Sequence, residues 1–346
     1  MNSNNNYADP YESYEELFDP LRTNRQARRK RRTKPNYKPK KTQEELIANT
    51  ADIIGLEGGL QITYVPAKHE KMWLLRSLRP FYDQELISDV EALVKGGKEA
   101  NVYRCAAHPA TGQKWLAAKV YRPRMFRNLR NDQMYRRGRT TLTANGVPAK
   151  ASDTRLMRAL GKKTGFGQQV AHTSWLMHEY TALELLHGAG ASVPKPFASG
   201  DNAILMSYIG DETGSAPTLN EIKLDEDEVW TLFQKVLRNI VLMLQYGRIH
   251  GDLSAYNILY WDRDVTLIDF PQIANSHVSK KTHVVGSAVN PDAEFILERD
   301  ITRVCEYFSA QGVNCDPDAI FGDVWDRYVE DDTQQRLADA STWLEE

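Results

Sequence analysis

The sequence lacks the features that mark membrane, secreted and zinc-binding proteins. Its longest unbroken apolar run, Ile240 to Leu244, is far shorter than the roughly 18–20 residues that a membrane-spanning helix needs. The first residues lack the basic-then-apolar order of a signal peptide. There are three cysteines and no Cys-x-x-Cys pair, which argues against a disulfide framework and a cysteine zinc site. We therefore expect a cytoplasmic protein with no membrane contact.

Two common hydrolase motifs and a strong net charge are also missing. No Glu-bearing His-x-x-x-His motif and no Gly-x-Ser-x-Gly elbow occurs, so neither a zinc hydrolase nor a serine hydrolase has support. The net charge is only −2, so any binding to a polyanion must be local. The 346 residues, 41% hydrophobic and 26% charged, fit one large or two modest globular domains.

The charge is unevenly distributed along the chain. Within residues 1–43, which we expect to be a disordered tail, Arg22 to Lys41 contains 11 Lys or Arg residues and no acidic residue. This run is either a solvated tail or a segment that docks to RNA through counterion release. A second basic stretch, about 122–173, is too long for an ordinary connection, and we expect a mobile loop. Residues 316–346 are acidic but have helical apolar spacing, which predicts a packed C-terminal helix.

The segments between the tails alternate between strand and helix patterns. Residues 44–92 carry enough apolar residues for a small N-terminal extension. A turn at 108–112 separates two β-type runs and predicts a hairpin of 100–105 with 115–121. Further on we expect a helix from about Ser174 to His187, a buried strand at 203–210 and a helix over 225–247.

The most informative spacing joins two carboxylates and an amide. Asp252 is followed five residues later by Asn257 and, after twelve more, by Asp269 at the end of an apolar strand. Kinase-like enzymes place a hydroxyl-orienting Asp and two magnesium ligands in this order. Asn257 and Asp269 would supply hard oxygen ligands to Mg²⁺, and Asp252 would orient the accepting group. The alternative, that these residues only cap turns, explains each alone but not all three at these spacings.

A second group of residues lies upstream. Gly97, Lys98 and Glu99 follow an apolar run, where a glycine turn lets backbone N–H groups approach phosphates, although the same turn is also a hairpin signal. Lys119 lies in the middle of an apolar run, which indicates either a lysine bound to phosphate or to an acidic partner, or an edge strand whose alternate side chains face water. We expect Glu179 to be its partner, with Glu184 as the alternative.

Together these residues resemble the RIO family of atypical protein kinases over roughly Leu93 to Val313. The resemblance rests on the following segments: Gly97-Lys98-Glu99-Ala100-Asn101-Val102-Tyr103, Ala118-Lys119-Val120-Tyr121, Glu179 in its helix, Val193-Pro194-Lys195-Pro196, Ile249 to Tyr260, Ile268-Asp269-Phe270-Pro271-Gln272, Asn290 to Phe295 and Arg299-Asp300.

The resemblance implies an α+β, two-lobed protein-kinase-like fold that binds ATP with Mg²⁺ or Mn²⁺. The β-rich N-lobe would span 93–206 and the mostly helical C-lobe 207–315. No Ala-Pro-Glu motif follows Asp269, so we expect a reduced RIO-type C-lobe without an activation segment. By the same resemblance, Met206 backs the adenine pocket, the backbone of Ser207 and Ile209 bonds the adenine edge, and Ser254 stands where ordinary protein kinases carry a lysine.

The implied activity is serine phosphorylation, autophosphorylation or ATP hydrolysis with transient phosphorylation of Asp269. One alternative is an assembly factor for an RNA particle, namely the small ribosomal subunit, whose ATP site acts as a switch and whose basic tail and loop grip ribosomal RNA. Another is a small-molecule phosphotransferase of the aminoglycoside or choline kinase type, which uses similar motifs. Besides ATP, the expected partners are a protein serine substrate and this RNA particle.

Overall fold

The structure is a computed structural model that describes residues 60–66, 68–97, 99–122, 139–150, 152–162, 164–279 and 287–330. The predicted basic tail, Lys98, the first part of the predicted loop and the end of the acidic C-terminal segment lie outside the described residues.

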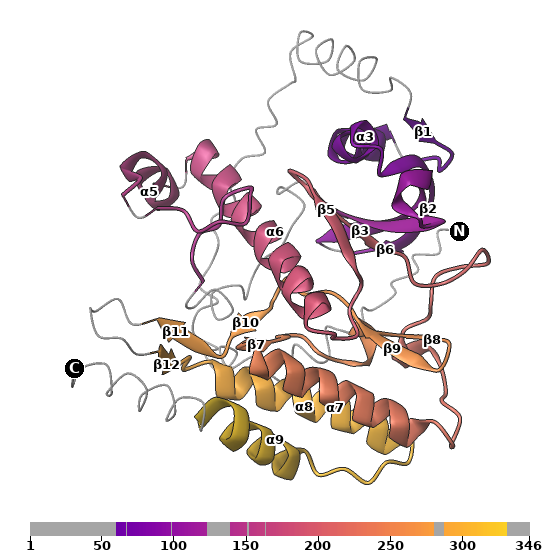
Figure 1. Ribbon diagram of the computed structural model, residues 1–346, viewed down its shortest axis with the longest axis vertical. Helices are drawn as coiled ribbons and strands as arrows, with labels where there is room; N and C mark the ends of the chain where they lie inside the picture. Colours follow the sequence, from indigo (N-terminus) through magenta and orange to yellow (C-terminus); the bar gives the residue numbers. More distant parts are fainter. Residues whose placement is uncertain are drawn as a thin grey trace, which may run out of the picture. The chain divides into compact units, whose positions relative to one another are not determined.

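The first half is built on a six-stranded sheet with the order β1-β2-β3-β4-β6-β5 (Figure 1). Its strands are β1 (Gln61–Ile62), β2 (Ile87–Gly96), β3 (Ala100–Ala107), β4 (Trp115–Tyr121), β5 (Pro196–Ser199) and β6 (Ala203–Ser207). β1 pairs parallel to β2, and the other neighbours pair antiparallel. The predicted hairpin is confirmed as β3 and β4, joined through a short 3-10 turn at Pro109–Thr111.

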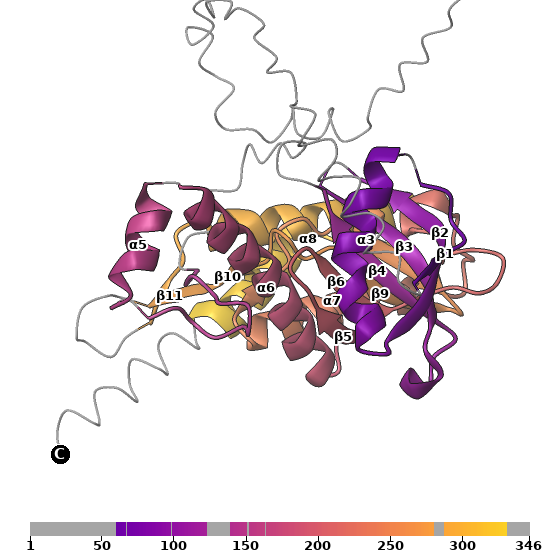
Figure 2. The same ribbon diagram turned by 90° about the horizontal axis from the view of Figure 1, so that it is seen from above.

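Helix α3 (Lys68–Asp83) packs against one face of this sheet (Figures 1 and 2). Because side chains alternate along a strand, one set faces α3 and the other set faces away. The α3 side forms a core of its own with these members: Leu74, Leu75, Leu78, Phe81, Val90, Tyr103, Cys105, Leu116, Ala118, Val120 and Leu205. The predicted domain border at 92/93 therefore falls inside β2, and the extension is part of the sheet-containing lobe.

The segment predicted as a loop differs from expectation over its second part. It contains α5 (Thr154–Gly161) and the beginning of α6 (Gly165–Gly188), so the helix predicted from Ser174 begins nine residues earlier. The Thr164 hydroxyl caps α6 by accepting a hydrogen bond from the Gly167 N–H at 3.1 Å. The weak apolar periodicity at this end concealed the helix, because its first turns face solvent or α5 rather than a core.

The second half is mostly helical. Its helices are α7 (Val229–Gln245), α8 (Ala293–Ala310) and α9 (Pro317–Trp325), which continues as a π-helical turn at Asp326–Glu330. Small antiparallel pairs lie between them: β7 (Arg248–Ile249) with β10 (Ala274–Asn275), β8 (Ile258–Trp261) with β9 (Asp264–Leu267), and β11 (His277–Ser279) with β12 (Ser287–Val289). Single 3-10 turns occur at Leu219–Glu221 and Ala255–Asn257.

Helices α7 and α8 share the core of this half, as the 5.2 Å separation of the Phe233 and Phe308 rings shows. The predicted helix over 225–247 is confirmed as α7, and the start of the predicted C-terminal helix is confirmed as α9. Among the described residues, no helix combines the length and apolar character required to cross a membrane. The result is the predicted α+β arrangement, with a β-rich half followed by a helical half.

Candidate active site

Lys119 is the centre of the site, and its position follows from the alternation along β4. Leu116, Ala118 and Val120 face α3, so Lys119 and Tyr121 project from the opposite face, toward α6. β4 lies in the interior of the sheet, so the edge-strand alternative for Lys119 is wrong.

The Lys119 ammonium lies between two carboxylates. It is 2.5 Å from Glu179 Oε1 on α6 and also bonds Oδ1 of Asp269. Glu179 is 2% exposed, and its other oxygen accepts a hydrogen bond from the Tyr121 hydroxyl. The predicted Lys119–Glu179 pair is confirmed, which leaves Glu184 outside this contact.

The charges in this group stabilise one another. Burial lowers the pKa of Lys119, but the carboxylates of Asp269 and Glu179 outweigh burial and raise that pKa above its ordinary value. Burial likewise raises the pKa of Asp269, but the Lys119 ammonium reverses the effect and the pKa lies below its ordinary value. The Asp269 side chain is still 44% exposed, so the ionised carboxylate can be reached from solvent.

Asn257 and Asp269 are brought together by the β8–β9 hairpin. Ile258 pairs with Leu267, which places Asn257 and Asp269 just beyond the same end of the hairpin. The Ile268 N–H donates to the Asn257 carbonyl at 2.9 Å and extends this pairing. Asp269 has a φ of +70°, a left-handed conformation that is uncommon outside glycine and is found at functional sites.

Asp252 lies in the loop between β7 and β8. Its Oδ2 accepts a hydrogen bond from Asn257 Nδ2 at 3.3 Å, and its Oδ1 is 2.9 Å from Arg303 Nη1 on α8. Burial raises the pKa of the Asp252 carboxyl, and Arg303 opposes that rise. His250 is 1% exposed and is held between the Ile268 carbonyl and the Asp252 N–H, so it is a buried hydrogen-bonding residue that braces the loop.

Gly251 allows this loop to pass close to the segment after Asp269. Its φ is +87°, and a Cβ at this position would lie 2.3 Å from the Gln272 carbonyl oxygen. The Gly251 N–H donates to Asp300 on α8 at 2.7 Å, and its carbonyl accepts from Arg299. Helix α8 therefore holds the backbone of this loop through both its N–H and its carbonyl group at Gly251.

The glycine loop joins β2 to β3. The Gly97 N–H donates to the Ala100 carbonyl at 2.9 Å, and a Cβ on Gly97 would lie 2.6 Å from that oxygen, so the tight turn requires glycine. Glu99 is half-buried, and its carbonyl accepts from the Arg122 N–H at 2.8 Å. Lys98 lies outside the described residues.

The predicted adenine residues lie at the end of β6. Met206 is partly buried against the main core, and Ser207 is fixed by its N–H bond to the Lys195 carbonyl at 2.8 Å. The Ile209 carbonyl accepts from the Ala216 N–H at 2.9 Å. The buried Ser254 hydroxyl, two residues after Asp252, has no hydrogen-bond partner within the described part of the chain.

Sequence reasoning missed three supporting side chains. Tyr121 could have been found, because it lies two residues after Lys119 on the same strand face. Arg303 follows Arg299 by one helical turn, a spacing visible in the sequence, but only the packing of α8 shows that it reaches Asp252. Arg139 donates to the Pro271 carbonyl at 3.2 Å, and no local pattern indicates that contact.

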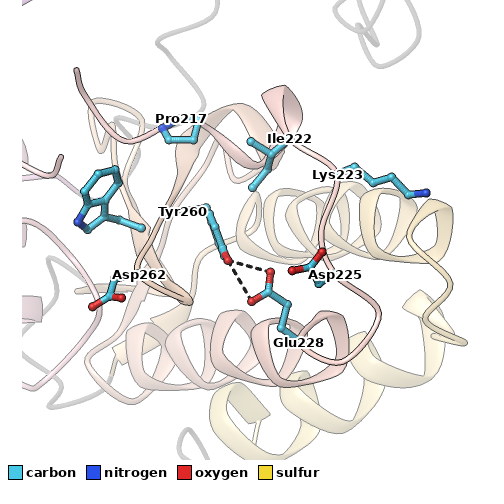
Figure 3. A pocket seen from close by; sticks show the side chains of 8 residues that line it. Pro217, Ile222, Lys223, Asp225, Glu228, Tyr260 and Asp262 are labelled. Atoms are coloured by element: carbon cyan, nitrogen blue, oxygen red, sulfur yellow. Dashed lines mark hydrogen bonds between the residues drawn. The ribbon is translucent and has the colours of Figure 1, made fainter. Parts of the chain in front are cut away.

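A separate cavity of about 520 Å³ lies between the segment before α7 and the end of the β8–β9 hairpin (Figure 3). It is lined by Pro217, Ile222, Lys223, Asp225, Glu228, Tyr260, Trp261 and Asp262, and the Tyr260 hydroxyl donates to Glu228 at 2.8 Å. None of the predicted site residues lines it. Its lining has three carboxylates and one ammonium, and this negative charge disfavours the binding of a triphosphate. The residues around Lys119, and not this cavity, are therefore the candidate active site.

A family model described as the RIO domain matches residues 134–320, more than half of the chain. The chain belongs to the RIO family. The family predicted from the motifs is thus confirmed, and the match covers Glu179, Asp252, Asn257 and Asp269 but begins after Lys119.

The relatives of this RIO protein are named as kinases. The RIO-type serine/threonine-protein kinase Rio1 of Thermoplasma acidophilum is 34% identical over 146 residues, which cover 42% of this chain and 69% of the relative. Rio1 of Haloferax volcanii is 27% identical over 234 residues, 66% of each chain. In RIO1 of Chaetomium thermophilum the aligned part covers only 43% of the relative, so the match does not extend over the whole of these proteins.

A solved structure supports the fold. The crystal structure of the Rio2 kinase from Chaetomium thermophilum has a TM-score of 0.50 and 18% sequence identity, with 84% of this chain and 80% of that chain covered. The predicted kinase-like α+β fold is confirmed. The family match and the names of the relatives together support the interpretation of this chain as a RIO-type serine/threonine protein kinase that uses ATP.

Proposed function

We propose that this chain transfers the γ-phosphate of ATP to a protein serine, either on itself or on another protein. The observation that carries the proposal is the contact of one buried ammonium, Lys119, with Glu179 and Asp269. A lysine placed in this way can bind ATP phosphates while the α6 carboxylate holds it in position. The RIO membership of the chain and the names of its relatives support this activity.

The adenine would bind at the end of β6 beside Met206. The Ser207 N–H and the Ile209 carbonyl are already bonded within the chain, so the adenine edge would use the Ser207 carbonyl and the Ile209 N–H. The phosphates would lie under Gly97, Lys98 and Glu99, where a glycine turn permits close backbone approach.

The metal would be held by Asn257 and Asp269. Their amide and carboxylate oxygens suit Mg²⁺ or Mn²⁺, and the unpartnered Ser254 hydroxyl could bond a phosphate or a metal-bound water. Among the described residues, no cluster of three His, Cys, Asp or Glu side chains could bind a metal alone. Nucleotide phosphates and water would supply the other metal ligands. When bound, the metal neutralises charge on the phosphates.

Asp252 would orient the accepting hydroxyl toward the γ-phosphate and take up its proton as the new bond forms. Lys119 and the metal-holding residues bind the phosphates, and the sheet and α8 fix their separation. If the Asp269 carboxylate attacks the γ-phosphorus instead, ADP leaves and a phosphoaspartate forms. Water would then hydrolyse this phosphoaspartate, so the same site would act as an ATPase.

A second function is favoured by the charge of α5 and its flanks. Lys150, Arg155, Arg158 and Lys162 are exposed, with Asp153 as the acidic residue among them. Such a surface can bind RNA by counterion release, which supports an ATP-switched role on a pre-ribosomal particle. The protein-kinase names of the relatives make a small-molecule phosphotransferase the less favoured alternative. Three free thiols fit the proposed cytoplasmic location.

The proposed roles are tested with labelled ATP and purified variants. Asp252→Ala should lower phosphate transfer about 10²- to 10⁴-fold while ATP binding is largely retained. Asp269→Ala should lose both metal and productive nucleotide binding. Asp201→Ala removes an exposed acid outside the site and is the matched control. Wild-type transfer rates in either of the first two variants would contradict the assigned roles.

A further inference from the structure

Helix α8 contacts the Asp252 loop through three residues on one face. Arg299 and Asp300 bind the carbonyl and the N–H of Gly251, and Arg303, one turn later, binds the Asp252 side chain. The first two contacts hold the backbone of the loop. The third reaches the carboxylate to which we assign the orientation of the acceptor.

The Arg303 contact involves only one of the two Asp252 oxygens. Arg303 Nη1 is 2.9 Å from Oδ1, whereas Oδ2 has a longer bond of 3.3 Å to Asn257 Nδ2. The side chain of Arg303 is 13% exposed and that of Asp252 is 26% exposed, so the pair is shielded from most solvent but can be reached from the site. A charge-assisted hydrogen bond in such a position restricts the rotation of the carboxylate.

We propose that Arg303 is a positioning residue that fixes Asp252 by one oxygen and directs the other oxygen toward the accepting hydroxyl. This inference rests on the proposed kinase function. Arg303 lies on α8, 51 residues after Asp252 in the sequence, so the orientation of Asp252 depends on how α8 packs. The orienting contact uses Oδ1 of Asp252, whereas Asn257, which we assign to the metal, bonds Oδ2.

This separation predicts a specific kinetic signature. Without Arg303, Asp252 can rotate, and a displacement of about 1 Å in a reacting group can cost on the order of 10²-fold in rate. We expect Arg303→Gln to lower kcat by about 10- to 100-fold, whereas KM for ATP and the dissociation constant of a fluorescent ATP analogue stay within about twofold of wild type. Arg303→Lys keeps the charge on a shorter side chain and should recover part of the lost kcat.

The experiment compares wild type, Arg303→Gln, Arg303→Lys, Asp252→Asn and the double variant Asp252→Asn/Arg303→Gln. Because Arg303 acts through Asp252, the substitution Arg303→Gln should lower kcat in the wild-type background but should have almost no further effect on kcat in the Asp252→Asn background. Glu306→Gln removes an exposed charge from the same helix and controls for general effects on α8. Melting temperatures identify any variant that fails to fold, and in that case Arg303→Lys alone decides the question by its kcat.

The inference would be overturned by an unchanged kcat in Arg303→Gln, by equal loss of kcat and nucleotide affinity, or by equal rates in the Lys and Gln variants. An additive loss in the double variant would do the same, because it indicates a structural role independent of Asp252. Failure of the proposed function looks different. The wild-type protein would then neither transfer label from ATP nor hydrolyse ATP, whatever the residue at position 303.

Discussion

Removal of the Lys119 ammonium tests the central ion group of the site. In Lys119→Met the side chain keeps a similar length but loses its charge, so Glu179 and Asp269 face each other without a cation. Glu179 is 2% exposed and cannot be rehydrated without opening the contact between β4 and α6. It keeps its bonds from the Tyr121 hydroxyl and, at 3.4 Å, from the Phe270 N–H.

The cost can be bounded from these contacts. Removal of one partner from a buried ion pair usually costs about 3–5 kcal/mol. Asp269 is 44% exposed, so solvent compensates part of its charge, and we expect the lower end, about 3 kcal/mol. Glu179→Gln should lower the free energy of unfolding by less, about 1–2 kcal/mol, because Lys119 keeps its ion pair with Asp269 and the amide oxygen can still accept a hydrogen bond from Tyr121.

Urea unfolding followed by tryptophan fluorescence measures both effects without nucleotide. The double variant Lys119→Met/Glu179→Gln no longer buries an unpaired carboxylate, so it should be more stable than the sum of the single losses predicts, by at least about 1 kcal/mol. If Lys119→Met is within about 0.5 kcal/mol of wild type, or if the two losses are additive, the ion group does not exist as described.

Three further results are expected. Burial lowers the pKa of His250 in the folded protein from its ordinary 6.5 to about 4. As pH falls, the unfolded chain therefore binds this proton before the folded protein does. The free energy of unfolding should be nearly constant above pH 6.5 and decline toward pH 4. Between pH 7 and 5 the loss is about 2 kcal/mol, and His250→Gln should lack this part of the pH dependence in urea titrations. Gly251 and Gly190 have similar φ values of +87° and +84°, but a Cβ would approach a backbone oxygen only at Gly251. Gly251→Ala should therefore lower the melting temperature more than Gly190→Ala, and equal shifts would rule out the close contact as the cause. Chelation with EDTA should stop phosphate transfer and added Mg²⁺ or Mn²⁺ should restore it, whereas metal-independent transfer would contradict the role of Asn257 and Asp269.

The motifs of the site could be read from the sequence because each is a local pattern. The spacing of Asp252, Asn257 and Asp269 spans one loop and one hairpin, and the apolar residues around that hairpin define its two strands. Lys119 was identified because a charged residue inside an apolar run demands a partner. The Lys119–Glu179 contact needed one further step, the lysine–glutamate pair that kinase-like sites assemble.

The features that sequence reasoning missed depend on packing between distant segments. Helix α5 spans only 8 residues and contains no buried residue, and the first turns of α6 contact little of the core, so neither stood out from the surrounding polar sequence. Arg139 and Arg303 carry no local signal for their contacts, because an arginine on a helix or loop is usually exposed.

The sequence by itself determined the family, the α+β class and the residues to which we assign the chemistry, since strand alternation, helix periodicity and motif spacing are properties of short segments. Only the tertiary structure decided which face of β4 holds Lys119 against α6, and that α8 reaches back to Asp252. Those choices depend on which apolar surfaces are buried against one another across the whole chain, and no short stretch of sequence contains that information.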